Sequence, residues 1–356
     1  MKVIIFTLLM GVSTVQASLD VSYELVKEGL GIVWGMDFSG DDLYFTEREG
    51  KIRKLNLNSK KVETFEGAPK VVKRNQGGML DIKLHPEFEK NNIIYFTYSK
   101  KMGEYQTTAL AQAKIEGKKL ISFKDIFIAK GKSDNHHHYG SRITFDNAGH
   151  LFLSVGDRGQ REKAQKLDNH QGKIIRLNLD GTVPKDNPFI SKVGALNEIW
   201  SYGHRNPQGL FYDTVSKKLF EMEHGPRGGD EINVVEKGKN YGWPVITYGK
   251  EYWGPFSIGE GTHKEGMEQP LIKYVPSIAP SGLTVYNGEK FPKLKGMLIS
   301  GALKLLHLNI VDQKGNEIAR LFENQNLRIR STVTGPKGEI YFSTDGGKIF
   351  RLIRKK

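Results

Sequence analysis

The chain of 356 residues contains no cysteine. This absence excludes disulfide bonds, a catalytic thiol and a lipoprotein anchor, which needs a cysteine after its signal. Amphipathic helical patterns are scarce, the apolar run near the N-terminus is too short to cross a bilayer, and no later segment looks transmembrane. The stability of the fold must therefore come from a core of short strands, with bound metal as a further contribution.

The first seventeen residues differ in composition from the rest. Lys2 is followed by the apolar run Val3–Val12, and Val15-Gln16-Ala17 resembles a signal-peptidase site. We therefore expect residues 1–17 to be a signal peptide, which makes the protein periplasmic or secreted; a buried N-terminal strand is the alternative. Residues 18–356 are expected to form a single catalytic domain.

Charge is unbalanced, with a formal net charge of +13. Such an excess can indicate nucleic acid, an anionic surface or an anionic ligand. However, the lysines and arginines are scattered along the chain without a basic helix or arm, and export also argues against nucleic acid. Two interpretations remain: a basic surface without a specific partner, or a basic pocket for a polyanionic cofactor.

A strand pair recurs along the chain. A glycine turn leads into a short strand of aromatic and β-branched residues, and a Gly-Lys-Ile strand follows. The clear copies are residues 40–46 with 50–55, 149–154 with 172–177, and 338–343 with 347–352; weaker copies of the first strand are 94–97, 219–222 and 297–300.

Six such units at spacings of roughly 45 to 80 residues are typical of propeller blades with loop insertions. The expected fold is therefore all-β: a six-bladed propeller with four-stranded antiparallel blades. The strand-like stretch 21–26 is expected to close the ring by pairing with the C-terminal blade. A β-sandwich is the structural alternative.

Four loop regions are too polar to be simple turns. They contain histidines, carboxylates and guanidinium groups, and Gly-Pro carbonyls beside carboxylates are hard oxygen ligands suited to Ca²⁺. A histidine beside an aspartate can also serve as a general base near neutral pH. The regions are residues 74–80, 135–142 with 154–159, 202–209, and 223–233 with 240–244.

The run His136-His137-His138 permits several interpretations. On a strand only His136 and His138 share a face, and no second histidine pair at ligand spacing is nearby, which disfavours zinc. A solvated loop and a catalytic histidine remain as the other readings.

Five segments together resemble the soluble PQQ-dependent sugar dehydrogenases, the glucose/sorbosone dehydrogenase family, and within it the compact aldose sugar dehydrogenases. The likeness runs in order from about residue 28 to 353. The segments are Gln76-Gly77-Gly78, His138-Tyr139-Gly140-Ser141-Arg142, Gly156-Asp157, Gly203-His204-Arg205-Asn206-Pro207-Gln208-Gly209 and Glu223-His224-Gly225-Pro226.

The resemblance implies a six-bladed propeller that oxidises aldose sugars at C1 to the lactone, by hydride transfer to pyrroloquinoline quinone (PQQ). His138 matches the general base and Asp157 the carboxylate that orients it. Arg205 matches the arginine that polarises the quinone oxygen. The electron acceptor that reoxidises the cofactor stays unidentified.

The resemblance also implies how PQQ and Ca²⁺ are held. Carbonyls of Gly225 and Pro226 match the calcium ligands at the quinone, and Glu231 and Tyr241 resemble a second calcium site. The three PQQ carboxylates need cations, and arginine can bind both oxygens of a carboxylate at once. The residues that match the cofactor site are Gln76, Arg205, Asn206, Tyr252, Lys304, Arg328 and Arg330.

Two departures from the family pattern matter. Ser141 replaces a glycine in the His-x-Gly-Gly-Arg segment, and the chain lacks the length of the dimeric glucose-specific enzymes. Narrow glucose specificity and dimerisation therefore do not carry over, and a monomer is expected. A calcium-dependent lactonase and a propeller that only binds a partner or glycan are the competing functions.

Overall fold

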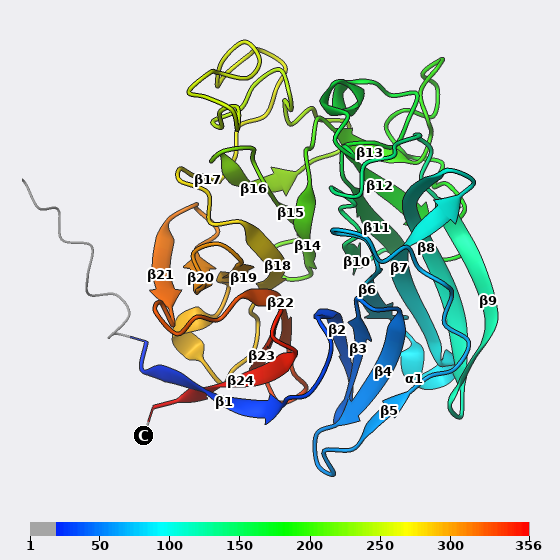
Figure 1. Ribbon diagram of the computed structural model, residues 1–356, viewed down its shortest axis with the longest axis vertical. Helices are drawn as coiled ribbons and strands as arrows, with labels where there is room; N and C mark the ends of the chain where they lie inside the picture. Colours follow the sequence, from blue (N-terminus) through cyan, green and yellow to red (C-terminus); the bar gives the residue numbers. More distant parts are fainter. Residues whose placement is uncertain (1–18, 356) are drawn as a thin grey trace, which may run out of the picture.

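The structure is a computed structural model that describes residues 19–355; the expected signal peptide lies outside the described residues. Six four-stranded antiparallel sheets stand around a common centre as blades 1 to 6 (Figure 1). Blade 1 contains β2 (Val33–Ser39), β3 (Asp42–Glu47), β4 (Lys51–Asn56) and β5 (Val62–Thr64); blade 2 contains β6 (Met79–Leu84), β7 (Ile93–Met102), β8 (Tyr105–Glu116) and β9 (Lys119–Ile128); blade 3 contains β10 (Ile143–Phe145), β11 (His150–Val155), β12 (Lys173–Asn178) and β13 (Ile199–Tyr202).

The remaining blades have the same order, from the centre outwards. Helical structure in the described residues is limited to single turns. Blade 4 contains β14 (Pro207–Asp213), β15 (Lys218–Glu223), β16 (Asp230–Val235) and β17 (Ile272–Tyr274); blade 5 contains β18 (Pro280–Val285), β19 (Leu298–Ala302), β20 (Leu308–Val311) and β21 (Glu317–Leu321); blade 6 contains β22 (Ile329–Thr334), β23 (Ile340–Thr344), β24 (Lys348–Arg354) and β1 (Val21–Lys27); the helical turns are α1 (Phe88–Asn91), η2 (Arg161–Gln165) and η3 (Pro292–Leu294).

The ring is closed by the two ends of the described chain. Strand β1 pairs antiparallel with β24, with Val21 opposite Arg354 and Leu25 opposite Phe350 (Figure 1). Tyr23 packs edge-on against Phe350, with ring centroids 5.2 Å apart. The expected pairing of residues 21–26 with the C-terminal blade is thus confirmed, as are the six blades.

The apolar core lies between successive blades, because each sheet buries its faces against its two neighbours. One cluster joins Tyr44 and Ile52 of blade 1 to Ile94 and Phe96 of blade 2. Such shared clusters make the ring one packed body around its centre.

The innermost strands crowd together, and this explains their glycines. A Cβ atom at Gly35 of β2 would lie 2.5 Å from Asp81 Oδ1 and 2.7 Å from the backbone nitrogen of Ile82 in β6. Only glycine lets two neighbouring inner strands approach this closely. The loops that leave these strands consequently meet over a narrow centre.

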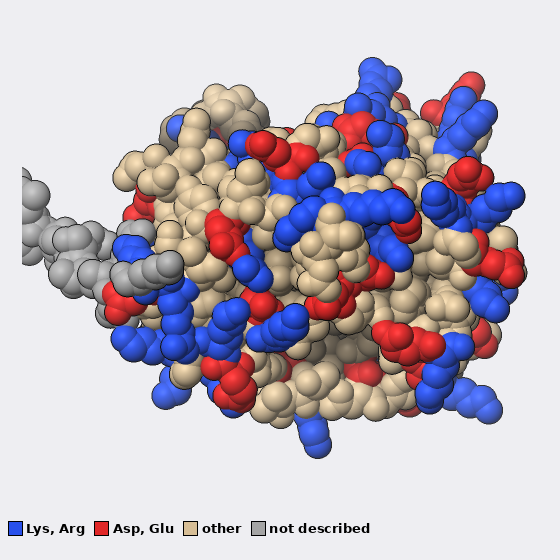
Figure 2. Space-filling model, turned by 90° about the horizontal axis from the view of Figure 1, so that it is seen from below, with Lys and Arg blue, Asp and Glu red and all other residues tan. Residues whose placement is uncertain are grey.

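Surface charge is mixed on the face shown in Figure 2, where Lys and Arg side chains lie interspersed with Asp and Glu. This agrees with the scatter of basic residues along the sequence. In the part of the chain that the structure describes, no helix is long and apolar enough to span a membrane.

Candidate functional site

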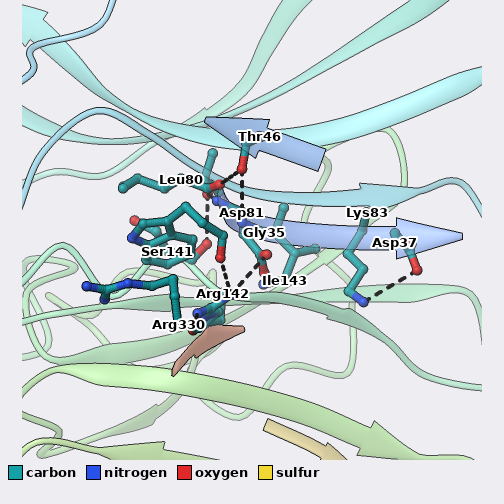
Figure 3. Close-up of polar contacts among 12 residues, drawn as sticks. Gly35, Asp37, Thr46, Leu80, Asp81, Lys83, Ser141, Arg142, Ile143 and Arg330 are labelled. Carbon is teal, nitrogen blue, oxygen red and sulfur yellow. Dashed lines mark hydrogen bonds and ion pairs between the residues drawn. The ribbon is translucent and has the colours of Figure 1, made fainter. Parts of the chain in front are cut away.

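A buried arginine ties the inner strands together at the centre of the ring (Figure 3). Arg142, directly before β10, donates from Nη1 to the carbonyl of Trp34 at 3.2 Å and pairs with Asp81 Oδ1 at 3.3 Å. It also donates to the carbonyls of Gln208 at 2.8 Å and Arg330 at 3.1 Å. One guanidinium thus connects blades 1, 2, 4 and 6.

The charge of Arg142 is retained despite burial. Burial lowers its pKa to about 10, and the charge of Asp81 opposes that shift. The guanidinium also lies 3.9 Å from the centroid of the Trp34 ring. At neutral pH Arg142 is therefore a buried cation paired with Asp81.

Cavity A, of about 240 Å³, is lined in part by Trp34, Gln208 and Arg330, the carbonyls of which Arg142 contacts. Four of the residues expected to hold the cofactor line it, together with apolar side chains and one further arginine, Arg48. The lining comprises the expected Gln76, Asn206, Arg328 and Arg330, and also Trp34, Arg48, Asn75, Leu80, Tyr139, Gln208, His224, Ala279, Leu303 and Asp345.

The amide of Asn206 has an unused donor at cavity A. Its Oδ1 accepts from the backbone N–H of Gly140 at 3.2 Å, whereas its buried Nδ2 has no partner among the described residues. A buried amide without a partner is costly unless a ligand or water completes it. Asn206 is therefore suited to donate to a bound molecule.

Arg328 and Arg330, two of the arginines expected to hold the cofactor, share a carboxylate. Asp345 accepts from Arg328 Nε at 2.7 Å and from Arg330 Nε and Nη2 at 2.8 and 2.9 Å. Although burial opposes it, the two arginines hold the pKa of Asp345 below its usual value. Asp345 thus fixes both guanidinium groups at the cavity wall and leaves a net positive charge there.

Cavity B, of about 170 Å³, contains the residues expected to act on the substrate. It borders cavity A, because Gln76 of cavity A accepts from the backbone N–H of His138 at 2.7 Å. Its lining comprises the expected His138, Asp157, Arg205, Pro226 and Tyr252, and also His137, Gly159, Arg161, Trp243, Glu251 and Ile258.

His138 and Asp157 form a direct pair. His138 Nδ1 lies 2.7 Å from Asp157 Oδ1, and the His138 side chain is 13% exposed. Two glycines allow this approach: Gly140 has φ +62°, and a Cβ at Gly156 would lie 2.2 Å from the carbonyl oxygen of His138. The segment before β10 and the segment after β11 must therefore touch to bring base and carboxylate together.

The pKa values of both groups favour a neutral His138 imidazole beside an ionised Asp157 carboxylate at neutral pH. Burial, aided by the charge of Arg205, lowers the pKa of His138 to about 4. For Asp157, His138 and Arg205 together outweigh burial and hold its pKa below the usual value. With Nδ1 committed to Asp157, the other ring nitrogen is left to accept a proton from a ligand.

We predict that His138 in the apo protein stays neutral far below the usual histidine range. Its pKa is lowered, so the imidazole gains a proton only as the pH falls through about 4. The measurement is the pH titration of the His138 ring proton by NMR, assigned by its absence in His138→Ala, with circular dichroism at each pH to verify the fold. A midpoint near the ordinary value of about 6.5 would contradict this environment.

Arg205, which lines cavity B, donates to backbone carbonyls of the segment that contains Gly225 and Pro226. Its Nη1 donates to the carbonyls of His224 at 3.0 Å and Gly225 at 2.8 Å. Tyr252 lies 3.5 Å from Nη2 and donates its hydroxyl to the carbonyl of Pro226 at 2.8 Å. The two carbonyls expected to bind calcium thus face the arginine and tyrosine expected at the cofactor.

The carbonyl groups of Gly225 and Pro226 are chemically suited to bind a calcium ion. Each carbonyl oxygen has two lone pairs, so Gly225 and Pro226 can each accept one hydrogen bond and still ligate a cation. The turn is fixed, because a Cβ at Gly225 would lie 2.2 Å from the carbonyl oxygens of Gly228 and Gly229.

A cluster of buried acids lies behind this turn. Glu221, Glu223 and His204 offer ligand atoms within 4.8 Å of one another, and Glu221 Oε1 and His204 Nδ1 are buried without a hydrogen-bond partner. Burial, together with the charge of Glu223, raises the pKa of both Glu221 and Glu231 well above the usual value. A cation would relieve this repulsion, and the carboxylate oxygens of these acids, rather than the nitrogen of His204, are ligands suited to a calcium ion.

Tyr241 contacts this cluster through its ring, whereas its hydroxyl bonds to backbone groups. Its hydroxyl donates to the carbonyl of Val234 at 2.7 Å and accepts from the N–H of Glu236 at 2.8 Å, and its ring stacks on His204 at 4.7 Å. Both sides of the hydroxyl are therefore engaged. With its donor and one acceptor site occupied, the hydroxyl is a poorer metal ligand than the main-chain carbonyl of Tyr241.

Among the expected site residues, Lys304 stands apart, since it is exposed and lines neither cavity A nor cavity B. Sequence reasoning also assigned no role to Asp345, Trp243 and the acids Glu221 and Glu223, although Glu223 and Trp243 lie in segments that it singled out. The two acids carried a signal: they are two positions apart on a strand and so share a face.

The comparisons place the chain among known proteins. The family model described as glucose/sorbosone dehydrogenase matches residues 30–353. The chain belongs to this family. It is 39% identical over 339 residues to aldose sugar dehydrogenase YliI of Escherichia coli K12, covering 92% of this chain and 91% of that one. The crystal structure of the soluble E. coli aldose sugar dehydrogenase in its apo form is 36% identical, with a TM-score of 0.90 over 94% of this chain and 99% of that chain.

A more distant relative is quinoprotein glucose dehydrogenase B of Acinetobacter calcoaceticus. It is 29% identical over 302 residues, which is 74% of this chain and 61% of that protein. As the match to the E. coli crystal structure shows, this chain shares its fold with a sugar dehydrogenase over nearly all of the described residues.

Proposed function

We propose that this family member is a PQQ- and calcium-dependent dehydrogenase that oxidises aldose sugars at C1 to the lactone. The observation that carries the proposal is the His138–Asp157 pair, which faces cavity B beside Arg205. The printed names of its relatives, an aldose sugar dehydrogenase and a quinoprotein glucose dehydrogenase, support the reaction class.

The side chains have distinct roles in this reaction. The free ring nitrogen of His138 takes the proton of the C1 hydroxyl, and Asp157 keeps the imidazole in the required tautomer. Arg205 provides positive charge where negative charge develops. When bound, PQQ supplies the acceptor for the hydride that leaves C1.

Cavity A suits a flat polyanion. Trp34 and Leu80 contribute apolar wall, while Arg328 and Arg330 offer guanidinium groups that match carboxylates. The unused amide of Asn206 adds a hydrogen-bond donor to this environment. The carbonyls of Gly225 and Pro226 would hold the calcium ion that adjoins the cofactor, and Glu231 with its buried neighbours would hold a second one.

The geometry favours this function over a lactonase. A calcium-dependent hydrolase needs carboxylates free to surround its metal. Of the described residues lining cavity B, the two acids are engaged elsewhere: Asp157 with His138, and Glu251 with Arg161 at 2.7 Å. A propeller that only binds a partner would need no base with an orienting carboxylate.

The signal-peptide pattern of residues 1–17 supports a periplasmic or secreted location for this enzyme.

Reconstitution tests the proposed function. Purified protein treated with a chelator should lose PQQ and all aldose oxidation measured with an artificial electron-acceptor dye. Adding PQQ with Ca²⁺ should restore turnover, whereas PQQ alone, or nicotinamide and flavin cofactors with Ca²⁺, should not. Absence of turnover with PQQ and Ca²⁺ across aldoses, or hydrolysis of lactones instead, would reject the proposal.

We predict that Arg330→Ala weakens PQQ binding by about one to two decades. The substitution removes a charge-assisted hydrogen bond, worth roughly 1.5–3 kcal/mol. Lys304→Ala should weaken binding less, because Lys304 is exposed and outside cavity A. Titration of apo protein with PQQ at saturating Ca²⁺ measures both variants. An unchanged titration curve for Arg330→Ala would show that PQQ binds elsewhere.

A further inference from the structure

The indole of Trp243 contacts the carboxylate of the base pair. Trp243 is 6% exposed, and its Nε1 donates to Asp157 Oδ2 at 2.8 Å. The other oxygen, Oδ1, contacts His138 Nδ1 at 2.7 Å and accepts from the N–H of Gly159 at 2.7 Å. Oδ1 of Asp157 is thus held by His138 and Gly159, and Oδ2 is held by the indole of Trp243.

The indole itself is held firmly. The backbone N–H of Trp243 donates to the carbonyl of Gly203 at 2.8 Å, and Gln165 Nε2 donates to the backbone carbonyl of Trp243 at 2.8 Å. The ring packs with the buried Ala164 and Ile258. Its donor therefore points to Asp157 from a fixed position.

The same indole also meets the catalytic cation. The guanidinium carbon of Arg205 lies 5.3 Å from the centroid of the Trp243 ring, within cation–π range. A single ring thus touches two of the three side chains expected to act in the reaction, and the third, His138, is bonded to one of them.

A carboxylate bonded through one oxygen can rotate about its Cβ–Cγ bond, and a strong donor on the second oxygen removes that freedom. We propose that Trp243 is a positioning residue, whose indole N–H holds Asp157 in the orientation that directs His138 toward the sugar. The inference rests on the proposed function, in which His138 is the base, and assigns to Trp243 a role through Asp157.

The test exploits a matched pair of tryptophans. Trp243→Phe removes the donor and keeps an aromatic ring beside Arg205. Trp200→Phe is the control, because Trp200 also lies under an arginine, Arg176 at 4.9 Å, but its buried indole nitrogen has no partner. We expect kcat for an aldose to fall about tenfold or more in Trp243→Phe, with KM and PQQ affinity within about twofold, and no change in Trp200→Phe.

A double-mutant cycle separates positioning from packing. If Trp243 acts through Asp157, then Trp243→Phe should cost little further kcat in an Asp157→Asn background. Independent losses that multiply would overturn the proposal. Replacing Trp243 by benzothienyl-alanine, which exchanges the N–H for sulfur in a ring of the same shape, should reproduce the loss without a cavity; full activity in that variant would also overturn it.

A readout without cofactor makes the inference independent of turnover. In apo protein, the Nδ1 proton of His138 should give a slowly exchanging downfield NMR resonance, assigned by its absence in His138→Gln. We expect Trp243→Phe to broaden this resonance or speed its exchange, and Trp200→Phe to leave it unchanged. An unaltered resonance in Trp243→Phe would reject the positioning role, whereas failure of wild-type protein to oxidise aldoses would reject the proposed function alone.

Discussion

His138→Ala is expected to lower kcat for aldose oxidation by roughly 10² to 10⁴-fold, the usual contribution of a positioned general base. The variant should still fold, because His138 lies on a loop between β9 and β10 and contributes no side chain to the apolar core. It should also keep PQQ, since Arg205, Arg330 and the carbonyl pair are unaltered. The measurement is dye-linked turnover at saturating PQQ and Ca²⁺, with PQQ titration in parallel.

The neighbouring histidines provide the controls. His137 lines cavity B and packs edge-on against His138 at 4.4 Å, whereas His136 contributes its carbonyl to the N–H of Gln76 at 3.0 Å. His136→Ala and His137→Ala should therefore be far milder in kcat. A crippled His136→Ala variant with an active His138→Ala variant would mean that the base has been misassigned, and three fully active variants would reject the mechanism.

The fold was predictable because one strand of each blade carries a recognisable pattern, which is clear in three blades and weaker in the other three. The six repeated segments found in the sequence are β3, β7, β11, β15, β19 and β23, the second strand of every blade. These strands are buried on both faces, which selects aromatic and β-branched residues. The first strands were missed because crowding at the centre selects small and polar residues instead, such as Gly35, Asp81 and Ser281.

The site was predictable where its residues lie in short ordered motifs, and hidden where partners are distant in the chain. His138 and Asp157 are 19 positions apart in adjoining polar loops. By contrast, Trp243 joins Asp157 across 86 positions, and Arg142 joins Arg330 across 188. Such pairs arise only when the blades assemble around the centre and bring loops of different blades together.

Arg142 is the extreme case of such a partnership, and its loss should be the most destabilising single change at the centre of the ring. Arg142→Met keeps the length of the side chain but leaves the buried carboxylate of Asp81 unpaired, which typically costs about 3–5 kcal/mol. The carbonyls of Trp34, Gln208 and Arg330 lose their donor as well. Urea unfolding of the apo protein should therefore show a clear drop in midpoint.

Two further variants test whether the loss arises from the unpaired charge. Arg320→Met removes an arginine that pairs with Glu317 at 2.8 Å on the surface, and such partly exposed pairs contribute about 0–1 kcal/mol. Asp81→Leu combined with Arg142→Met should be more stable than Arg142→Met alone, because no buried charge is then left without a partner. If Arg142→Met unfolds at the same urea concentration as Arg320→Met, the central arginine does not hold the inner strands together, and the ring depends on the apolar contacts between blades alone.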